Sequence, residues 1–409
     1  MDLMPILSTL RRHKTAATLI VLEIALTSAI VCNALHLIST RLTSLNHDTG
    51  LPENELVVMR VRGTVNAPNV DDATALDLQT LRALPGVKSV ALLNQVPYGS
   101  NSNSTSVSLE PEGNERMRVS SSHYLGSEDT LQTLGLKLAA GRDFKPEEYR
   151  WASEVDKEDA ARVPQVIVNR ALAEKLFPEQ PLQQALGKVV YVYGKSPSTI
   201  VGVVEQLPHP QPKRRVESAK TSMLFPLRPA YRAGGFVLRT EEGQRESVIK
   251  AATAALEKLD RTRVVTAGQT LEETRRTYYA QDRAMVWLMG GVIVALMVVT
   301  AFGIVGLASF WVAQRTRMIG TRRALGATQS QIRSYFQLEN FMLSTAGIVL
   351  GMGGAMGLSL WLMSSHEVPR LPLAYLPVGA LALWALGQLA VLAPARRAAA
   401  LPPVAALRA

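Results

Sequence analysis

The sequence predicts an α+β membrane protein: four transmembrane helices, with a large α+β domain outside the cytoplasm inserted between the first and the second. Three observations indicate this fold. Four apolar segments are long enough to cross about 30 Å of hydrocarbon, one near the N-terminus and three after residue 283. More than two hundred residues separate the first two, and none of them forms a segment that could span a membrane. Basic residues cluster beside span ends that would share the cytoplasmic side.

The composition fits a membrane protein with a sizeable polar part. The chain has 409 residues, which is room for about two domains plus membrane segments. Its formal charge is +10, but many basic residues lie beside apolar spans and no nucleic-acid-binding motif accompanies them, so a nucleic-acid partner is not expected. The single cysteine, Cys32, lies inside the first span, which leaves the outer domain without a disulfide or a cysteine-based metal site.

The N-terminal segment predicts a short cytoplasmic interfacial helix followed by the first span. Residues 1–15 place apolar side chains at helical spacing and end in a basic run from Arg11 to Lys14. Residues 16–40 then form a span that is longer than the apolar part of a signal peptide and has no small-x-small cleavage site after it. We expect this span to be retained, with its N-terminus in the cytoplasm. Glu23 within it is unusual: it faces the protein interior, snorkels to the membrane surface or has a functional role.

Residues 41–270 predict a folded domain of strands and helices. The expected strands are Glu55–Val61, Val87–Val96, Pro164–Val168, Ser198–Val204, Thr221–Pro226, Phe236–Arg239 and Arg263–Thr266, and the expected helices are Asp71–Leu84, Arg170–Phe177 and Gln244–Leu259. The tract from Gly99 to Ser108 is rich in Gly, Ser and Asn and predicts a flexible loop. Both ends of the domain have a β-α-β pattern around a different middle, which indicates one subdomain split by an inserted one at residues 113–205. His209 and the basic tripeptide after Pro212 are candidates for contact with an extracytoplasmic partner.

The rest of the chain predicts a stalk, three spans and a basic loop. The segments are a helical stalk at 271–283, spans at 284–313, 336–363 and 372–393, and a cytoplasmic tail at 394–409. The loop at 314–335 carries five arginines and no acidic residue, as is typical of a cytoplasmic loop between spans. A Gly320-Thr321 break and a turn at Gly326 divide it into short helices that would lie along the membrane surface. On charge alone, these arginines either meet lipid or a cytosolic partner, or only orient the chain.

The third span contains two pairs of glycines at the spacing that favours close helix packing. They are Gly347 with Gly351 and Gly353 with Gly357. We therefore expect this span to approach its neighbours closely.

The sequence contains no recognisable catalytic or metal-binding motif. The nearest approach to a phosphate-binding loop is Gly194-Lys195-Ser196, but Val189 stands where the first glycine is required, and the segment falls on the wrong side of the membrane. HExxH, G-x-S-x-G and cysteine clusters are absent, and the six histidines are scattered. We therefore expect a non-catalytic chain without a cofactor of its own.

Several stretches of sequence resemble the FtsX/MacB-type permeases of ABC transport systems. RTRMIGTRRALGAT in the basic loop, an apolar span with an early Glu339, and the ending PARRAAALPPVAALRA have the pattern of that family's permease domain. VSSSHYLGSEDTLQTLGLKLAAGRDF, VIVNRALAEKLFPEQPLQQALGKVV and TIVGVVEQ, in that order, are similar to its periplasmic core. The resemblance covers nearly the whole chain with one departure: MacB carries an ATPase on the same polypeptide, and this sequence shows none.

The resemblance implies a multi-pass permease subunit of the bacterial inner membrane, with its large domain in the periplasm. A cytoplasmic ABC ATPase supplied in trans would bind ATP, and its motion would pass through the stalk to the outer domain for export or extracytoplasmic release of a substrate (mechanotransmission). Other implied partners are a second copy or a sister permease, a periplasmic adaptor protein and membrane lipid. The residues expected to couple the loop to the ATPase are Arg315, Arg317, Arg322, Arg323, Leu325, Gly326, Arg333 and Glu339, with Asn340 helping Glu339 to anchor the loop unless that glutamate only snorkels. The alternative is a membrane-tethered periplasmic binding or regulatory protein that acts without an ATPase.

Overall fold

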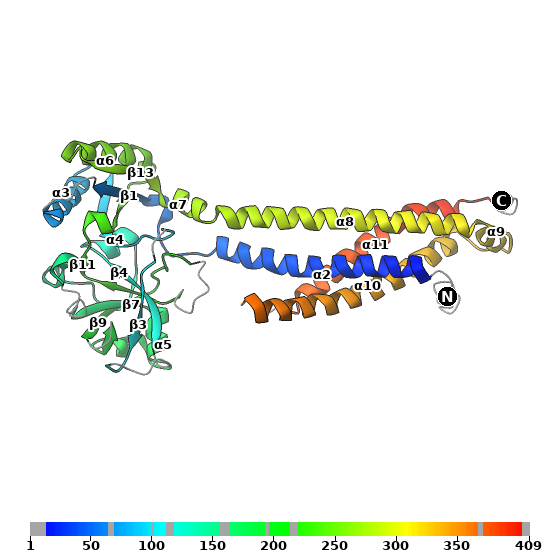
Figure 1. Ribbon diagram of the computed structural model, residues 1–409, viewed down its shortest axis with the longest axis horizontal. Coiled ribbons are helices and arrows are strands. Elements are labelled where there is room, and N and C mark those ends of the chain that lie inside the picture. The colour runs from blue at the N-terminus through cyan, green and yellow to red at the C-terminus, as the bar shows by residue number, and fades with distance from the viewer. Residues whose placement is uncertain are drawn as a thin grey trace. The chain divides into compact units, whose positions relative to one another are not determined.

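The computed structural model describes residues 14–63, 69–99, 102–111, 118–155, 163–192, 196–212, 220–366 and 371–402. The chain divides into two compact units (Figure 1). A membrane unit contains Met1–Leu45 and Gln281–Ala409, and an outer unit contains Asn46–Ala280. The interfacial helix expected at 1–15 and the last part of the tail lie almost wholly outside the described residues, and so does the basic tripeptide at 213–215. His209, the other candidate for contact with an extracytoplasmic partner, is buried.

Four long helices make up the membrane unit, and each is apolar enough to cross a membrane. They are α2 (Lys14–Leu45), α8 (Ala280–Gln314), α10 (Gln329–His366) and α11 (Tyr375–Ala399). This confirms the predicted arrangement of one span, an α+β domain and three further spans. The helices extend beyond most of the predicted span ends, because polar residues at a helix end continue the backbone hydrogen bonding without being apolar.

Close packing of α2 against α10 depends on two glycines. A Cβ on Gly347 would lie 2.8 Å from the Ile24 side chain, and one on Gly351 would lie 2.5 Å from the Ala25 carbonyl oxygen. The absence of a side chain at these two positions lets the backbones of α2 and α10 approach each other. Gly353 and Gly357 differ, since a Cβ on either would meet no atom within 4 Å among the described residues.

The outer unit contains a four-stranded antiparallel sheet whose strands come from both ends of the domain. Its strands are β1 (Leu56–Gly63), β2 (Val87–Leu93), β12 (Gly235–Thr240) and β13 (Arg263–Thr270), in the order β13-β1-β12-β2. Helices α3 (Val70–Arg82) and α6 (Arg245–Leu259) pack on it through one core that includes Leu81, Phe236 and Leu256. Residues nearly 200 positions apart in sequence thus form a single subdomain.

A second, seven-stranded sheet lies between those ends in sequence. Its strands are β3 (Ser104–Ser108), β4 (Val119–Leu125), β5 (Leu138–Gly141), β7 (Gln165–Asn169), β8 (Val189–Val192), β9 (Ser196–Val204) and β10 (Ser222–Phe225), in the order β5-β9-β7-β10-β4-β3-β8. Strand β9 also pairs with β8, so the sheet closes on itself. Alternate residues such as Val166 and Val168 pack into one core with α5 (Arg170–Leu176), as the period of two along a strand requires.

Smaller elements complete the outer unit. They are α4 (Thr130–Leu134), the paired strands β6 (Arg150–Trp151) and β11 (Leu227–Arg228), α7 (Leu271–Tyr278), and 3₁₀ turns at Glu53–Glu55, Pro146–Glu148, Ala152–Glu154, Leu182–Ala185 and Tyr231–Ala233. A capping box begins α7, because the Thr270 hydroxyl accepts from the Glu273 amide at 3.1 Å and the Glu273 carboxylate accepts from the Thr270 amide at 2.9 Å.

The structure differs from the sequence-based expectation at four places. The break expected at Gly320-Thr321 is wrong, because both residues lie inside one continuous helix, α9 (Thr316–Ala324). The expected loop at 99–108 is wrong in its second half, because Ser104–Ser108 is strand β3, which pairs with β4 and β8. Four of its five residues are Ser or Thr, so no apolar alternation announces it. The closed sheet runs from Ser104 to Phe225, beyond the expected 113–205, and the helix expected at 271–283 is interrupted at Tyr279, between α7 and α8.

Candidate functional site: the elbow between α8 and α10

The basic loop folds into a compact turn between α8 and α10, which we call the elbow (residues 311–343). It contains the nine-residue helix α9 (Thr316–Ala324). Gly326 ends α9 with a φ of +96°, a conformation that side chains with a Cβ rarely adopt, and the Ala327 amide donates back to the Arg322 carbonyl at 3.0 Å. Thr328 and Gln331 then form reciprocal hydrogen bonds that begin α10. The residues of the turn itself, from Gly326 to Gln331, therefore favour this reversal of the chain.

A buried ion pair holds the elbow together. The Nη1 of Arg315, at the junction of α8 and α9, donates to both carboxylate oxygens of Glu339 on α10, at 3.0 and 2.9 Å. Arg315 is 7% exposed and Glu339 is 1% exposed. The Arg315 guanidinium also lies over the Trp311 ring, 5.2 Å from its centroid. Glu339 therefore binds Arg315 inside the protein rather than snorkelling, and Arg315 does not lie on the surface.

Helix α9 also packs on the membrane unit through a small apolar core. Ile319 of α9 is buried with Ile332 and Phe336 of α10 and with Ala395 and Ala398 of α11. Gly320 is buried at the same place on α9. The elbow is consequently fixed to two helices by apolar contact and to α10 by the ion pair as well.

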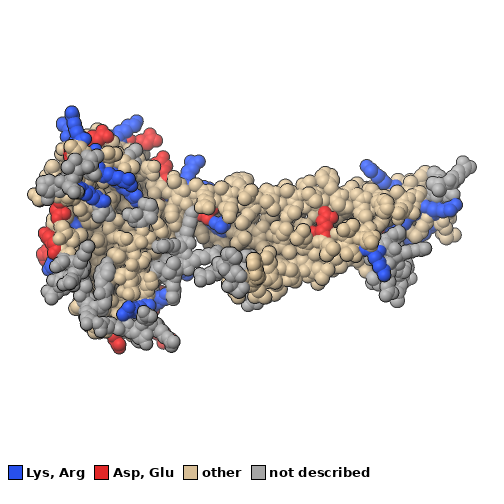
Figure 2. All heavy atoms as spheres, in the orientation of Figure 1, with Lys and Arg blue, Asp and Glu red and all other residues tan. Residues whose placement is uncertain are grey.

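The outer face of the elbow carries the remaining predicted residues. Leu325, at the tip, is 83% exposed, which is unusual for a large apolar side chain, and Arg317 is also exposed. Arg322 is half-buried with its guanidinium 4.9 Å from the centroid of the Tyr335 ring, and half-buried Arg323 donates to the Ala327 carbonyl at 3.3 Å. Arg333 is half-buried on α10. Figure 2 shows basic side chains at the end of the membrane unit that carries α9.

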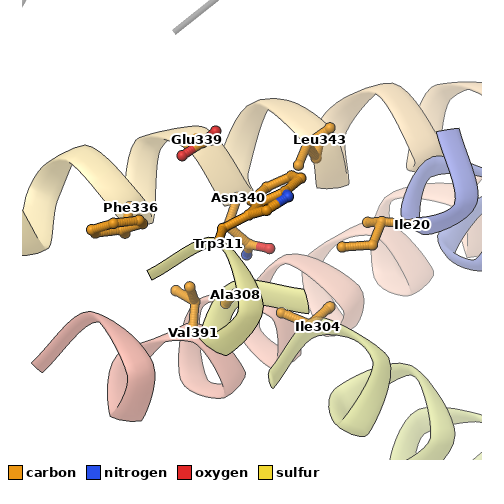
Figure 3. A pocket seen from close by; sticks show the side chains of 9 residues that line it. All are labelled: Ile20, Ile304, Ala308, Trp311, Phe336, Glu339, Asn340, Leu343 and Val391. Atoms are coloured by element: carbon orange, nitrogen blue, oxygen red, sulfur yellow. The ribbon is translucent and has the colours of Figure 1, made fainter. Parts of the chain in front are cut away.

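All four membrane helices meet at a small cavity beside the ion pair (Figure 3). Its volume is about 10 Å³, and Trp311, Glu339 and Asn340 supply its polar lining. The Trp311 Nε1 and the Asn340 Nδ2 are buried and have no hydrogen-bond partner among the described residues. A space of this size holds about one water molecule, which would give these donors an acceptor.

The eight residues that the sequence analysis expected to couple the loop to an ATPase therefore fall into three groups. Arg315 and Glu339 are brought together and buried, whereas Arg317, Leu325 and Gly326 lie on the exposed side. Arg322, Arg323 and Arg333 are half-buried, and the first two contact other parts of the elbow. The sequence analysis missed Trp311 and Tyr335, whose rings lie against the guanidinium groups of Arg315 and Arg322. Trp311 could have been found, because it lies four residues before Arg315 on a helical segment, a spacing that brings two side chains together.

Across the described residues, no group of three or more His, Cys, Asp or Glu side chains could hold a metal ion. The geometry offers a packed corner with an exposed apolar tip at Leu325 and exposed positive charge at Arg317.

Comparison with known proteins defines the class: a membrane permease of the ABC-transporter type with a periplasmic domain. Residues 15–272 match the MacB-like periplasmic core domain and residues 290–403 match the FtsX-like permease C-terminal region. The chain therefore belongs to the family of FtsX-like permeases with a MacB-like periplasmic core, which confirms the resemblance seen in the sequence.

Individual relatives are moderately similar. The macrolide export ATP-binding/permease protein MacB of Chromobacterium violaceum is 28% identical over 292 residues, which are 68% of this chain and 42% of that protein. The probable syringafactin export ATP-binding/permease protein SyfD of Pseudomonas syringae is 28% identical over 289 residues, 68% of this chain and 40% of that protein. The crystal structure of the periplasmic region of MacB from Actinobacillus actinomycetemcomitans covers 57% of this chain and 97% of that one, at 15% identity and a TM-score of 0.35. The chain thus spans about two fifths of these two curated relatives.

Proposed function

We propose that this chain is the permease subunit of an ABC transport system in the inner membrane and couples ATP hydrolysis by a separate cytoplasmic ATPase to motion of its periplasmic domain. The motion would export a substrate or release it outside the cytoplasm. A second copy or a sister permease would complete the membrane part, and a periplasmic adaptor would join the outer domain. The Arg315–Glu339 ion pair is the observation that carries the proposal, because it fastens an exposed cytoplasmic corner to the membrane helices.

The tip of the elbow supplies the docking surface. Leu325 would enter an apolar groove on the ATPase, and burying a leucine contributes about 1.5–3 kcal/mol. Arg317 is exposed in the first turn of α9, at the opposite end of that helix from Leu325, and would meet acidic groups or carbonyls of the partner. Arg322 and Arg323 already have contacts within the elbow, so they contribute to docking partly by holding its shape.

Force applied at the tip would reach the membrane helices with little loss. Helix α9 cannot move freely, since Ile319 is enclosed by α10 and α11 and Arg315 is paired with Glu339. Densely packed interiors transmit displacement rather than absorb it. The nearest span to respond is α8, which continues directly from the junction at Arg315.

Two variants separate docking from coupling. Leu325→Ser with Arg317→Ala should lower co-purification of the ATPase about tenfold or more, while leaving membrane insertion unchanged. Gln329→Ala, an exposed change on the same turn, is the matched control and should bind normally. Arg315→Met with Glu339→Met replaces the ion pair by apolar side chains of similar size, so the protein should fold and dock but stimulate its ATPase less. Undiminished ATPase binding by the Leu325/Arg317 variant would sink the docking assignment.

One observation favours the alternative function, a periplasmic binding protein that acts without an ATPase. The outer unit has a pocket of about 340 Å³ whose polar lining includes His47, Asn169, Glu205, His209 and Lys220. Pockets of this size accept small ligands. A ligand retained by the purified chain, together with full biological activity in the absence of any ATPase, would favour this second function.

A further inference from the structure

Glu23 lies in the seam between two membrane helices. It belongs to α2, and its carboxylate rests directly on Gly303 of α8: a Cβ at position 303 would overlap both carboxylate oxygens. One turn further along the same seam, the hydroxyls of Thr27 and Thr300 are hydrogen-bonded at 2.9 Å. The glycine therefore makes room for an acidic group one turn from a threonine pair that joins the two helices.

The Glu23 carboxylate has no hydrogen-bond or ion-pair partner among the described residues. This differs from Glu339, the other glutamate of the spans that the structure describes, which is bound by Arg315. The Glu23 side chain is also partly exposed rather than enclosed. An unpaired carboxylate at membrane depth is unfavourable, and a cation placed beside it removes much of that cost.

The surroundings of Glu23 are apolar and exposed. On α2, Leu19 and Leu26 lie on the same helix face as Glu23, at spacings of four and three residues, and are 68% and 63% exposed. Leu22 directly precedes Glu23 and is 58% exposed. On α8, Phe302 next to Gly303 is 72% exposed. A single acidic group is thus framed by leucine and phenylalanine side chains.

We propose that the α2–α8 seam binds a lipophilic cation, with the positive charge against Glu23 and the apolar body along Leu22, Leu26 and Phe302. Charge and shape both point to this class of ligand, because a hydrophilic cation would lose its hydration at this depth and a neutral apolar molecule would leave the carboxylate unpaired. The site goes beyond the proposed coupling to an ATPase. It uses no elbow residue, so it can be present even if the docking assignment fails.

Binding of tetraphenylphosphonium to the purified full-length chain in phosphatidylglycerol nanodiscs tests the site. The parent chain should bind this cation saturably, and Glu23→Gln should weaken binding at least tenfold. Glu23→Asp keeps the charge and should retain part of the affinity, whereas Gly303→Ala should weaken binding by displacing the carboxylate. Tetraphenylborate has the same shape and the opposite charge, and its partitioning should be the same for parent and Glu23→Gln.

Two further experiments test whether the cation comes from a lipid and whether the variants remain folded. Adding phosphatidylethanolamine to the nanodiscs should compete with the probe if a lipid amine fills the site in the membrane, and should have no effect if the ligand is a free amphiphile. Unfolding midpoints of all variants establish that each is folded. Equal binding of tetraphenylphosphonium by the parent and Glu23→Gln would overturn the proposal. Loss of self-association in Glu23→Gln, with cation binding unchanged, would overturn it in favour of a contact between copies.

Discussion

Arg263 and Asp77 form a bidentate ion pair in the core of the outer unit, with N–O distances of 2.6 and 2.9 Å. Asp77 is fully buried on α3 and Arg263 begins β13, so the pair joins segments 186 residues apart in the split subdomain. The Arg263 guanidinium also lies 5.1 Å from the centroid of the Tyr231 ring. The last strand is thereby attached to an early helix by charge as well as by backbone pairing.

Removing one partner of this pair should destabilise the outer unit strongly. Asp77→Ala leaves a buried guanidinium without its carboxylate, which costs about 3–5 kcal/mol. Asp77→Leu combined with Arg263→Met should be much less damaging, because no buried charge remains. Protease resistance of the purified chain, measured against urea concentration, reports both effects. A double variant as unstable as the sum of its single changes would show that the two residues act independently.

Replacing a glycine of α10 by alanine should destabilise the protein at Gly351 but not at Gly353. Gly351→Ala places a methyl group 2.5 Å from the Ala25 carbonyl oxygen and the Ser28 Cβ, so α2 and α10 must separate, at a cost of about 1–3 kcal/mol. Gly353→Ala, two residues away, meets no described atom and should be neutral or slightly stabilising, since alanine favours a helix over glycine. Thermal unfolding of the two variants in the same detergent measures the difference. Equal midpoints would contradict the packing role of Gly351.

The outer unit should lose stability in mild acid partly through His123. Burial lowers the pKa of this imidazole from 6.5 to about 4. Between these values the unfolded chain takes up a proton at His123 and the folded chain does not, so stability falls as the pH falls from 6.5 to 4. The loss is about 3 kcal/mol when complete, because one pKa unit is worth about 1.4 kcal/mol. In His123→Asn, unfolding free energy measured across this range should depend less steeply on pH; an unchanged slope would contradict the assignment.

Membrane topology can be checked with single cysteines on a Cys32→Ser background. Ser247 is exposed on α6 of the outer unit and Ser330 is exposed at the start of α10. In cells with a permeable outer membrane, an impermeant thiol reagent should label Ser247→Cys and not Ser330→Cys. The second site should become reactive only after the inner membrane is opened, which is the control for accessibility. Labelling of Ser330→Cys in intact cells is incompatible with a cytoplasmic elbow.

The elements that could be predicted from sequence are those encoded by neighbouring residues. Apolar runs long enough to span a membrane located all four helices, and the arginine-rich loop located the elbow, because hydrophobic length and local charge do not depend on tertiary contacts. The helices α3, α5 and α6 were also predicted close to their observed ends. Strand β3 was not, since its serines acquire their role only by pairing with β4 and β8.

By itself, the sequence determined the class of fold, the four membrane helices and the position of the turn at Gly326. Tertiary structure alone decided which charges meet: Arg315 pairs with Glu339, Asp77 with Arg263, and Glu23 rests unpaired on Gly303. It also decided that Gly351 is enclosed while Gly353 is not. Composition and periodicity describe each helix separately, but the partner of a buried charge and the neighbour of a glycine depend on the rotation and crossing of two packed helices, which no local pattern records.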